Sequence, residues 1–180
     1  GANNITMTDD ATIVELDFTG ITNVQTLTTA TKAFTSLDLG ALALAAGVTT
    51  VTGVGAKDDT VNIAAAFTND LTVNVATGDD DINANASYAG ALTVAGAAAS
   101  FDTNDTIDGG AGTSDTIAIN ADNDGTGAVL DDLVRIENVT VSANTGTASH
   151  NAKVTLSYTS ANTDALTIDA SALTDTGAVF

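Results

Sequence analysis

The chain of 180 residues is long enough for one large domain or two small ones, and an apolar content of 44% excludes simple polar disorder. Four Lys and Arg against 23 Asp and Glu give a net charge of -19, which excludes the basic patch needed to bind nucleic acid or an anionic membrane. Cysteine is absent, so disulfides and thiolate metal sites are excluded.

Residues 1–47 are expected to form an N-terminal β-rich segment, and residues 48–180 an acidic-repeat module. Residues 1–10 have neither the basic start nor the apolar region of a signal peptide, and no apolar run in the chain is long enough to span a bilayer. Residues 35–46 are rich in Leu and Ala at a spacing that favours a helix.

Alternation of apolar and polar residues predicts β-strands through much of the chain. Proline is absent while Thr and Val are frequent, and this composition also favours strands over helices. One helical turn is predicted at residues 130–137, leading into a strand. The alternating segments are residues 71–75, 116–120, 138–142, 154–158 and 166–169.

An internal repeat lies in the middle of the chain. Asp59 precedes Leu71 by the same interval at which Asp80 precedes Leu92, so an aspartate and a strand recur together. A third copy begins at Asp105, slightly later than a strict period would place it, and an apolar residue again follows at the same interval, at position 117. The spacing from Asp59 to Asp80 is typical of one coil of a β-solenoid.

We therefore expect an all-β fold, either a β-solenoid or an elongated strand stack with short helical turns. Stacked coils bury one narrow core, which suits a chain with only 4% aromatic residues and no Trp. The alternative is an ordinary β-sandwich in which the Asp clusters are turn residues.

Aspartate provides most of the acidity, since Glu15 and Glu137 are the only glutamates. Asp is the short carboxylate that turns favour, and it is common in loops that bind cations through oxygen. In a solenoid, equivalent carboxylates would lie about 4.7–4.9 Å apart and repel one another unless a cation or solvent intervened. Bound calcium is therefore as plausible as solvated turns at Asp58, Asp59 and residues 79–81.

The densest acidic stretch covers residues 102–117 and holds three glycines, at positions 109, 110 and 112, followed by Asp115 and Ile117. It resembles the nonapeptide G-G-x-G-x-D-x-U-x of repeats-in-toxin proteins, in which Asp and backbone carbonyls bind calcium and the U residue points inward. One extra residue precedes Asp115, so the turn must absorb this insertion for Asp115 to be a ligand.

The motifs at residues 105–112, 133–141 and 166–173 follow one another in an order similar to modules of S-layer proteins and large adhesins. Gram-negative bacteria export those proteins by type I secretion. The resemblance implies calcium-dependent folding and assembly on the extracellular cell surface. Together with the repeat, it makes the candidate calcium ligands Asp58, Asp59, Asp79, Asp80, Asp81, Asp102, Asn104, Asp105, Asp108, Gly110, Gly112 and Asp115.

Other acidic clusters are weaker candidates. Residues 122–125 resemble part of an EF-hand loop that would begin at Asn120 and end at Asp131, although such loops usually begin with Asp and end with Glu. Catalysis is not expected, because the single histidine, His150, has no acidic neighbour in sequence and no G-x-S-x-G elbow occurs. Four basic residues also make a solenoid polysaccharide lyase a weak alternative.

These observations predict a secreted, structural component of a bacterial cell-surface layer that self-associates into a lattice or filament and is rigidified by Ca2+. The alternative is an adhesin module that binds a surface glycan, or another extracellular ligand such as ice. Threonines at positions 26, 28, 29 and 31 could contribute to a flat ligand face. Such a face needs T-x-T ranks on successive coils, and no such register is expected from the sequence.

Overall fold

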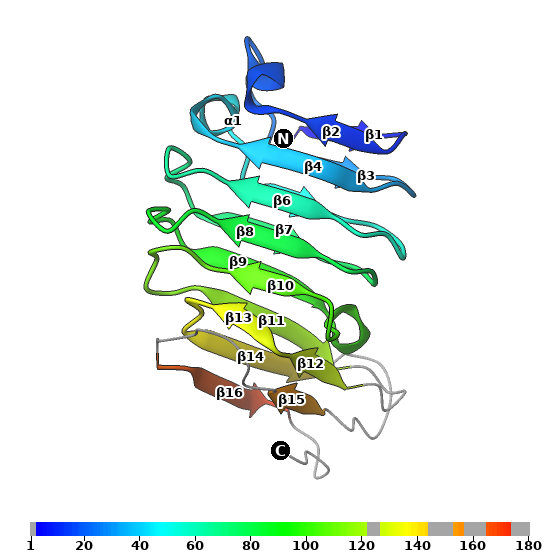
Figure 1. Ribbon diagram of the computed structural model, residues 1–180, viewed down its shortest axis with the longest axis vertical. Coiled ribbons are helices and arrows are strands. Elements are labelled where there is room, and N and C mark those ends of the chain that lie inside the picture. Colours follow the sequence, from blue (N-terminus) through cyan, green and yellow to red (C-terminus); the bar gives the residue numbers. More distant parts are fainter. Residues whose placement is uncertain (1–2, 122–126, 144–152, 157–164, 174–180) are drawn as a thin grey trace.

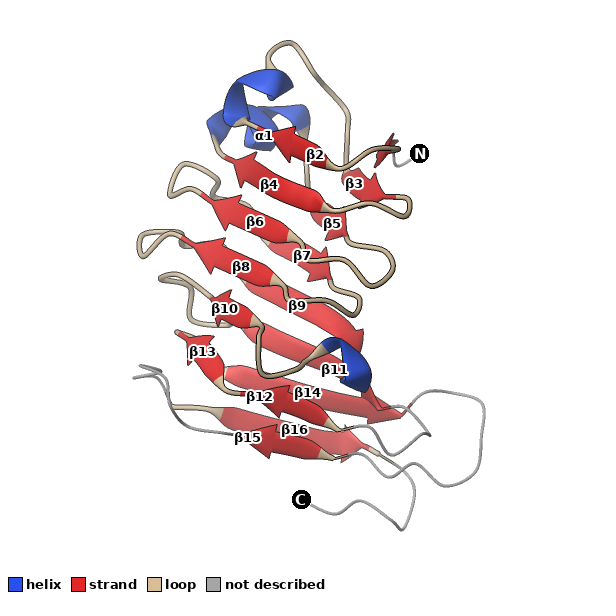
Figure 2. Cartoon of the chain, turned by 45° about the vertical axis from the view of Figure 1, so that its right-hand side comes forward, coloured by secondary structure: helices blue, strands red, loops and turns tan. Residues whose placement is uncertain are grey.

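The computed structural model describes residues 3–121, 127–143, 153–156 and 165–173, which form a β-solenoid of stacked coils (Figure 1). Successive coils add strands to two parallel sheets that face each other across the core, and every strand pairing in the described part is parallel (Figure 2). The predicted all-β solenoid is therefore confirmed.

Sheet A has eight strands and sheet B has six. The strands of sheet A are, in spatial order, β1 (Asn4–Met7), β3 (Thr26–Thr29), β5 (Thr50–Thr52), β7 (Leu71–Asn74), β9 (Leu92–Ala97), β11 (Thr116–Ala121), β14 (Asn138–Ala143) and β16 (Thr167–Ala172). Those of sheet B are β2 (Ala11–Ile13), β4 (Phe34–Leu39), β6 (Thr60–Ile63), β8 (Asp81–Ala84), β10 (Thr106–Asp108) and β13 (Asp132–Val134).

Further elements complete the described fold. Strands β12 (Ala128–Leu130) and β15 (Val154–Leu156) pair with each other in a small third sheet. The short helices are η1 (Glu15–Phe18), α1 (Ala41–Ala46) and η2 (Ala98–Ser100). No helix among the described residues is long and apolar enough to cross a membrane.

The core is a narrow layer of aliphatic side chains between the sheets. Within each strand, alternate residues point inward, as Val73 does in β7 and Ile82 does in β8, and both are buried. The larger aromatic rings lie at the corners between the sheets, where Phe67 and Tyr88 pack with ring centroids 6.4 Å apart. Because the core between the sheets is narrow, aliphatic side chains fill most of it and few aromatic residues are needed.

Strand register confirms the internal repeat but corrects its third copy. Val73 of β7 pairs with Val94 of β9, and Val94 pairs with Ile117 of β11. Ile117 therefore repeats the position of Val94 rather than that of Leu92, which the sequence spacing predicted. The reason is a shorter corner, because the chain from Asp105 to Asp115 has fewer residues than the equivalent chain from Asp80 to Leu92.

Both helical predictions need correction. Residues 35–39 belong to strand β4, where Leu37 and Leu39 point into the core, and only residues 41–46 are helical. Residues 130–137 contain no helix; the chain instead runs through strands β12 and β13 and turns at Arg135, whose φ is +52°. Core burial on alternate residues outweighs the helix propensity of Leu and Ala in the first case.

One column of threonines on sheet A has a regular register that the sequence did not predict, although full T-x-T ranks occur only on β3 and β5 among the described strands of this sheet. Thr26, Thr50, Thr72, Thr93 and Thr116 occupy equivalent positions on five successive strands. The intervals between them along the sequence are unequal, because the corner loops differ in length. This variation hides the alignment from any search at one fixed period.

Strands from both sides of residue 47 lie in the same two sheets. The pairing of β3 with β5 and of β4 with β6 connects the predicted N-terminal segment to the predicted acidic-repeat module. One core runs continuously through these strands.

Candidate functional site

The acidic residues gather at the two corners of the solenoid, where the chain passes between the sheets. At the A-to-B corner, Asp59, Asp80 and Asp105 immediately precede strands β6, β8 and β10. At the B-to-A corner, Asp70 and Asp115 immediately precede β7 and β11. Coil stacking aligns Asp59, Asp80 and Asp105 into one column. Asp115 aligns instead with Glu137 of the next coil, whereas Asp70 lies two coils away and one residue out of register.

Asp59, Asp80 and Asp105 form the inner column of the A-to-B corner and are 4%, 2% and 7% exposed. The backbone N–H of Asp59 donates to Asp80 Oδ1 at 2.8 Å, and that of Asp80 donates to Asp105 Oδ1 at 2.8 Å. The N–H of Phe34 donates in the same way to Asp59 Oδ1 at 2.6 Å. Each carboxylate thus accepts a backbone hydrogen bond from the preceding coil.

Burial is the main influence on the ionisation of this column. It raises the pKa of Asp80 to about 7, opposed by the hydrogen bond from the Asp59 N–H and reinforced by the charges of Asp59 and Asp105. Burial likewise raises the pKa of Asp105 to about 6 and that of Asp59 above its ordinary value. Asp80 Oδ2 is buried with no hydrogen-bond partner, consistent with a carboxyl group that is poorly solvated when charged.

An outer column at the same corner consists of Asp58, Asp79 and Asn104, all exposed. The Asp79 N–H donates to Asp58 Oδ1 at 3.0 Å, and the Asn104 side-chain amide donates to Asp79 Oδ1 at 3.1 Å. Asp102 lies beside this column; its N–H donates to Asp105 Oδ2, and its own Oδ1 accepts the Asn104 N–H. The structure brings together seven of the predicted ligands at this corner, namely Asp58, Asp59, Asp79, Asp80, Asp102, Asn104 and Asp105.

Asp81 and Asp108 lie apart from these columns, on strands of sheet B. The Asp81 carboxylate accepts a hydrogen bond from the Thr106 hydroxyl, and Asp108 forms an ion pair with Arg135. Asp108 also accepts the Gly110 N–H at 3.0 Å, which closes the turn after β10. Both carboxylates therefore have local structural partners.

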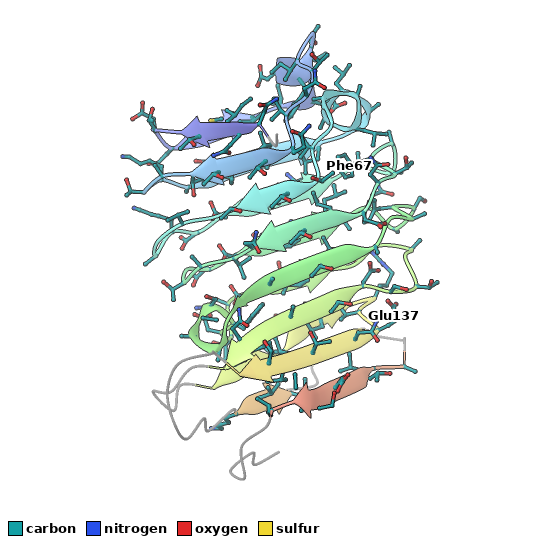
Figure 3. All side chains as sticks on the ribbon, turned by 180° about the vertical axis from the view of Figure 1, so that it is seen from behind. Phe67 and Glu137 are labelled. Atoms are coloured by element: carbon teal, nitrogen blue, oxygen red, sulfur yellow. The ribbon has the colours of Figure 1, made fainter. Side chains whose placement is uncertain are left out.

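The B-to-A corner carries Asp70 and, two coils further on, a second acidic column formed by Asp115 and Glu137. Asp70 Oδ1 accepts the Ala91 N–H at 2.9 Å, and Asp115 Oδ1 accepts the Leu92 N–H at 2.7 Å. Glu137, which immediately precedes β14, continues the pattern by accepting the Asp115 N–H at 2.8 Å. Figure 3 shows Glu137 at this side of the stack, below Phe67 of the turn between β6 and β7.

Asp115 is the most enclosed carboxylate of the second column, with no exposed surface. Burial raises its pKa to about 6; the charges of Glu137 and Asp108 raise it further, whereas Arg135 lowers it. Asp115 Oδ2 is buried without a hydrogen-bond partner. Ile117 is also buried, so Asp115 and Ile117 both face inward and the turn has absorbed the extra residue of the nonapeptide-like stretch.

The glycines of that stretch are required by close packing between coils. A Cβ atom on Gly109 would lie 2.2 Å from the Arg135 carbonyl oxygen, and one on Gly112 would lie 2.7 Å from Asp115 Oδ2. Gly110 has a φ of +91°, which favours glycine. Their spacing therefore has a structural cause independent of any ligand.

The described residues contain no group of three or more His, Asp or Glu side chains arranged to hold a metal ion. Calcium takes about six to eight oxygen ligands, so a site here would also need backbone carbonyls or water. Asp80 Oδ2 and Asp115 Oδ2 have no hydrogen-bond partner, but both atoms are buried and they lie at opposite corners of the solenoid. The two oxygens therefore do not belong to one donor set.

Asp70, Glu137 and Glu15 are not among the calcium ligands predicted from the sequence. The signal for the first two was available, because each directly precedes a predicted strand, as Asp59 and Asp80 do. Glu15 accepts the Leu42 N–H at the start of α1 and packs against Gly40. Two earlier candidates, residues 122–125 of the EF-hand-like segment and His150, lie outside the described residues.

A groove of about 470 Å³ lies over the C-terminal ends of β4, β6 and β8. Its polar lining includes Glu15, Asp38 and three asparagines, of which Asn62 donates to Asp38 Oδ1 at 2.9 Å. The other two asparagines of the lining are Asn83 and Asn85.

Comparisons with known proteins identify no relatives: no family model, no curated protein and no solved structure matches this chain.

Proposed function

We propose that this chain is a structural, self-assembling module of a bacterial cell-surface layer, secreted to the extracellular surface and rigidified by calcium. The likeness of residues 104–180 to S-layer and adhesin modules motivates the assignment. The solenoid supports it, because coils that stack in one direction form an elongated body with strand edges at its ends.

The observation that carries the assembly part of the proposal is the strand edge at the N-terminal end. β1 and β2 are the outermost strands of their sheets, so among the described residues each pairs on one side only. Ile5, Met7 and Ile13 pack against the core there while remaining partly exposed. Proline, which would block strand addition, is absent from the chain. A further coil, from a second copy or from a longer chain, could therefore extend both sheets.

Calcium enters the proposal because it would relieve the repulsion between stacked carboxylates. Asp80 and Asp115 are buried, and each has one oxygen without a hydrogen-bond partner. A hard cation at these oxygens would replace the protons that their raised pKa values otherwise favour. The ion would then stabilise the folded chain by mass action, since the unfolded chain offers no such arrangement.

Thermal unfolding near pH 8 in calcium, in magnesium and in excess chelator, at equal ionic strength, tests the role of calcium. Calcium should raise Tm above the value in chelator, and magnesium should substitute poorly because it demands stricter geometry. Asp115→Asn should reduce the calcium-dependent rise. Asp132→Asn, which removes the same charge from an exposed position in β13, should preserve it. Equal Tm values in calcium and chelator would exclude a stabilising calcium site.

Electron microscopy and sedimentation across a calcium series test the assembly. Sheets or filaments should form in calcium and disperse on chelation, because copies with a charge of -19 repel one another unless cations are shared between them. Sodium chloride at matched ionic strength is the control. A chain that stays monomeric throughout, or that associates equally well in salt alone, would contradict calcium-driven assembly.

The groove at the ends of β4, β6 and β8 favours a second candidate, an adhesin module that binds a neutral glycan. Carboxylate and amide groups such as Asp38, Asn62 and Asn83 can bind sugar hydroxyls, since carboxylates accept hydrogen bonds and amides both donate and accept them. If the chain binds soluble oligosaccharides and Asn62→Ala abolishes this binding, the result would support the adhesin function over the structural one.

A further inference from the structure

The outer face of sheet A carries two columns of short side chains, which we call the threonine face. The first column consists of residues that pair with Thr26 or with its equivalents on the other strands of sheet A. The second column consists of the residues two positions later on the same strands. The first column comprises Asn4, Thr26, Thr50, Thr72, Thr93, Thr116, Asn138 and Thr167, and the second comprises Thr6, Thr28, Thr52, Asn74, Ala95, Ala118, Thr140 and Asp169.

Pleating of the strands separates this face from the core. The residue between the two columns points inward on each strand, as Leu27, Val51 and Val73 do, and these side chains are 1–2% exposed. The threonines of the first column therefore point to the opposite, outer side. Figure 3 views the molecule from this side, where the strands of sheet A lie one above another in a single layer.

Charge distribution distinguishes the two outer faces. Asp169, on the last strand, is the one ionisable residue in the two columns of the threonine face. The outer face of sheet B, by contrast, carries Asp38, Asp81 and Asp108. In a chain with a charge of -19, a face this free of carboxylates suits an uncharged partner.

The threonine hydroxyls of the first column are available to such a partner, whereas the hydroxyls of Thr28 and Thr52 in the second column are hydrogen-bonded to Asn4 and Asn74. Within the described residues, no protein hydrogen bond is found for the side-chain hydroxyls of Thr26, Thr50, Thr72 and Thr93. Threonine is stiff at χ1, and each of these residues is held in a paired strand. Little conformational entropy is therefore lost when the hydroxyls bind to a surface.

The spacing of the columns is regular in two directions. Neighbouring strands place equivalent threonines about 4.7–4.9 Å apart, and alternate residues along a strand lie about 6.6–6.8 Å apart. The result is a rigid column of hydroxyl and methyl groups on five successive strands, flanked by a second column of short side chains, rather than a concave pocket. Such an array is complementary to a solid whose own hydrogen-bonding atoms repeat on the same scale.

We propose that the threonine face binds ice. Ice presents uncharged, regularly spaced water molecules that can donate to and accept from threonine hydroxyls. The face lacks the aromatic rings that would stack on a sugar, since Phe34, Phe67 and Tyr88 are buried. It also lacks the large apolar side chains that would stabilise pairing with a second copy. This inference goes beyond the structural role proposed above and does not depend on calcium-driven assembly.

Partitioning of the fluorescently labelled 180-residue chain into a slowly growing ice hemisphere tests the proposal. The unmodified chain should be incorporated into the ice and should shape growing crystals. Thr50→Lys places a bulky solvated charge on the face and should abolish incorporation. Thr60→Lys is the matched control, because Thr60 is the first residue of β6 in sheet B as Thr50 is the first residue of β5 in sheet A. This control should retain incorporation.

Thr72→Val, which keeps the β-branched shape but removes one hydroxyl, provides a second variant in case Thr50→Lys fails to fold by circular dichroism. It should reduce incorporation while Tm is retained. Exclusion of the unmodified chain from ice, or equal incorporation of the Thr50 and Thr60 variants, would overturn the proposal. The proposal would also be overturned if the chain does not bind ice and instead binds insoluble neutral polysaccharide, or dimerises, in a way that Thr50→Lys abolishes.

Discussion

At the scale of single residues, the corner aspartates act as acceptors for backbone N–H groups that precede the strand ladder. The side chain of each aspartate spans the distance to the N–H of its counterpart one coil away, as the Asp80 carboxylate does for the Asp59 N–H. The hydrogen bond satisfies a buried donor, but burial makes the ionised carboxylate unfavourable, and the neighbouring carboxylates add repulsion. Burial therefore favours the protonated carboxyl group of Asp80 in the folded chain.

Substitution of Asp80 separates these two effects. Asp80→Ala removes the acceptor of the Asp59 N–H and should lower the free energy of unfolding by about 1–3 kcal/mol at pH 5. Asp80→Asn keeps an oxygen acceptor without the charge. It should be as stable as the unmodified chain at pH 5 and more stable, by roughly 2–4 kcal/mol, near pH 8 without calcium.

Urea unfolding at the two pH values measures both effects. Asp79→Asn is the control, because it removes the same charge from the adjacent, exposed residue and should change stability little at either pH. Equal effects of Asp80→Asn and Asp79→Asn would mean that only bulk charge matters.

At the scale of elements, each strand separates its residues between the core and an outer face. In β7, Val73 is buried while Thr72 and Asn74 point outward, and β5 and β9 pair with β7 in the same register. A slip of one residue would expose the valines and bury the threonines, so burial specifies the register. The same register sets the positions of the corner carboxylates and the threonine face.

Paired substitutions in β7 test this orientation. Val73→Ala should lower the free energy of unfolding by about 2 kcal/mol, because it removes two buried methyl groups and leaves a cavity. Thr72→Ala should change it by no more than about 1 kcal/mol, the range of β-propensity at an outer position. Chemical unfolding of the two variants measures the difference. A larger loss for Thr72→Ala than for Val73→Ala would contradict the assigned register.

At the scale of the whole molecule, the acidic residues are unevenly distributed. Two columns of carboxylates follow the corners, sheet B adds further Asp residues on its outer face, and the outer face of sheet A is almost uncharged. The carboxylates and the uncharged threonine face therefore occupy separate regions of the molecule. A thin core and the absence of disulfides leave its stability sensitive to the charge state of the corners.

The pH dependence of stability follows from the raised pKa values. Folded-state pKa values of about 7 for Asp80 and about 6 for Asp105 and Asp115 exceed the ordinary value of 3.8, so the folded chain binds more protons than the unfolded chain. The stabilisation is fully present below pH 3.8 and is lost as pH rises through about 6 to 7. We therefore expect Tm to fall between pH 5 and pH 8 in chelator.

A pH series of thermal unfolding, with and without calcium, measures this loss. Calcium should flatten the decline if it occupies the ionised carboxylates. A Tm that rises from pH 5 to pH 8 in chelator would mean that the corner carboxylates are ionised at little cost in the folded chain.

Local signals in the sequence were enough to predict the all-β class, the solenoid repeat and the alignment of the aspartates that precede the strands of sheet B. Alternation, coil-length spacing and turn-forming residues are local signals, so Asp59, Asp80 and Asp105 could be aligned without a structure. Only the tertiary structure decided what these residues contact: Asp80 accepts a backbone N–H, and Gly112 is required by the close approach of Asp115. It also revealed the threonine face. Corner loops of unequal length shift the repeat along the sequence, whereas hydrogen bonding between neighbouring strands restores the alignment in space.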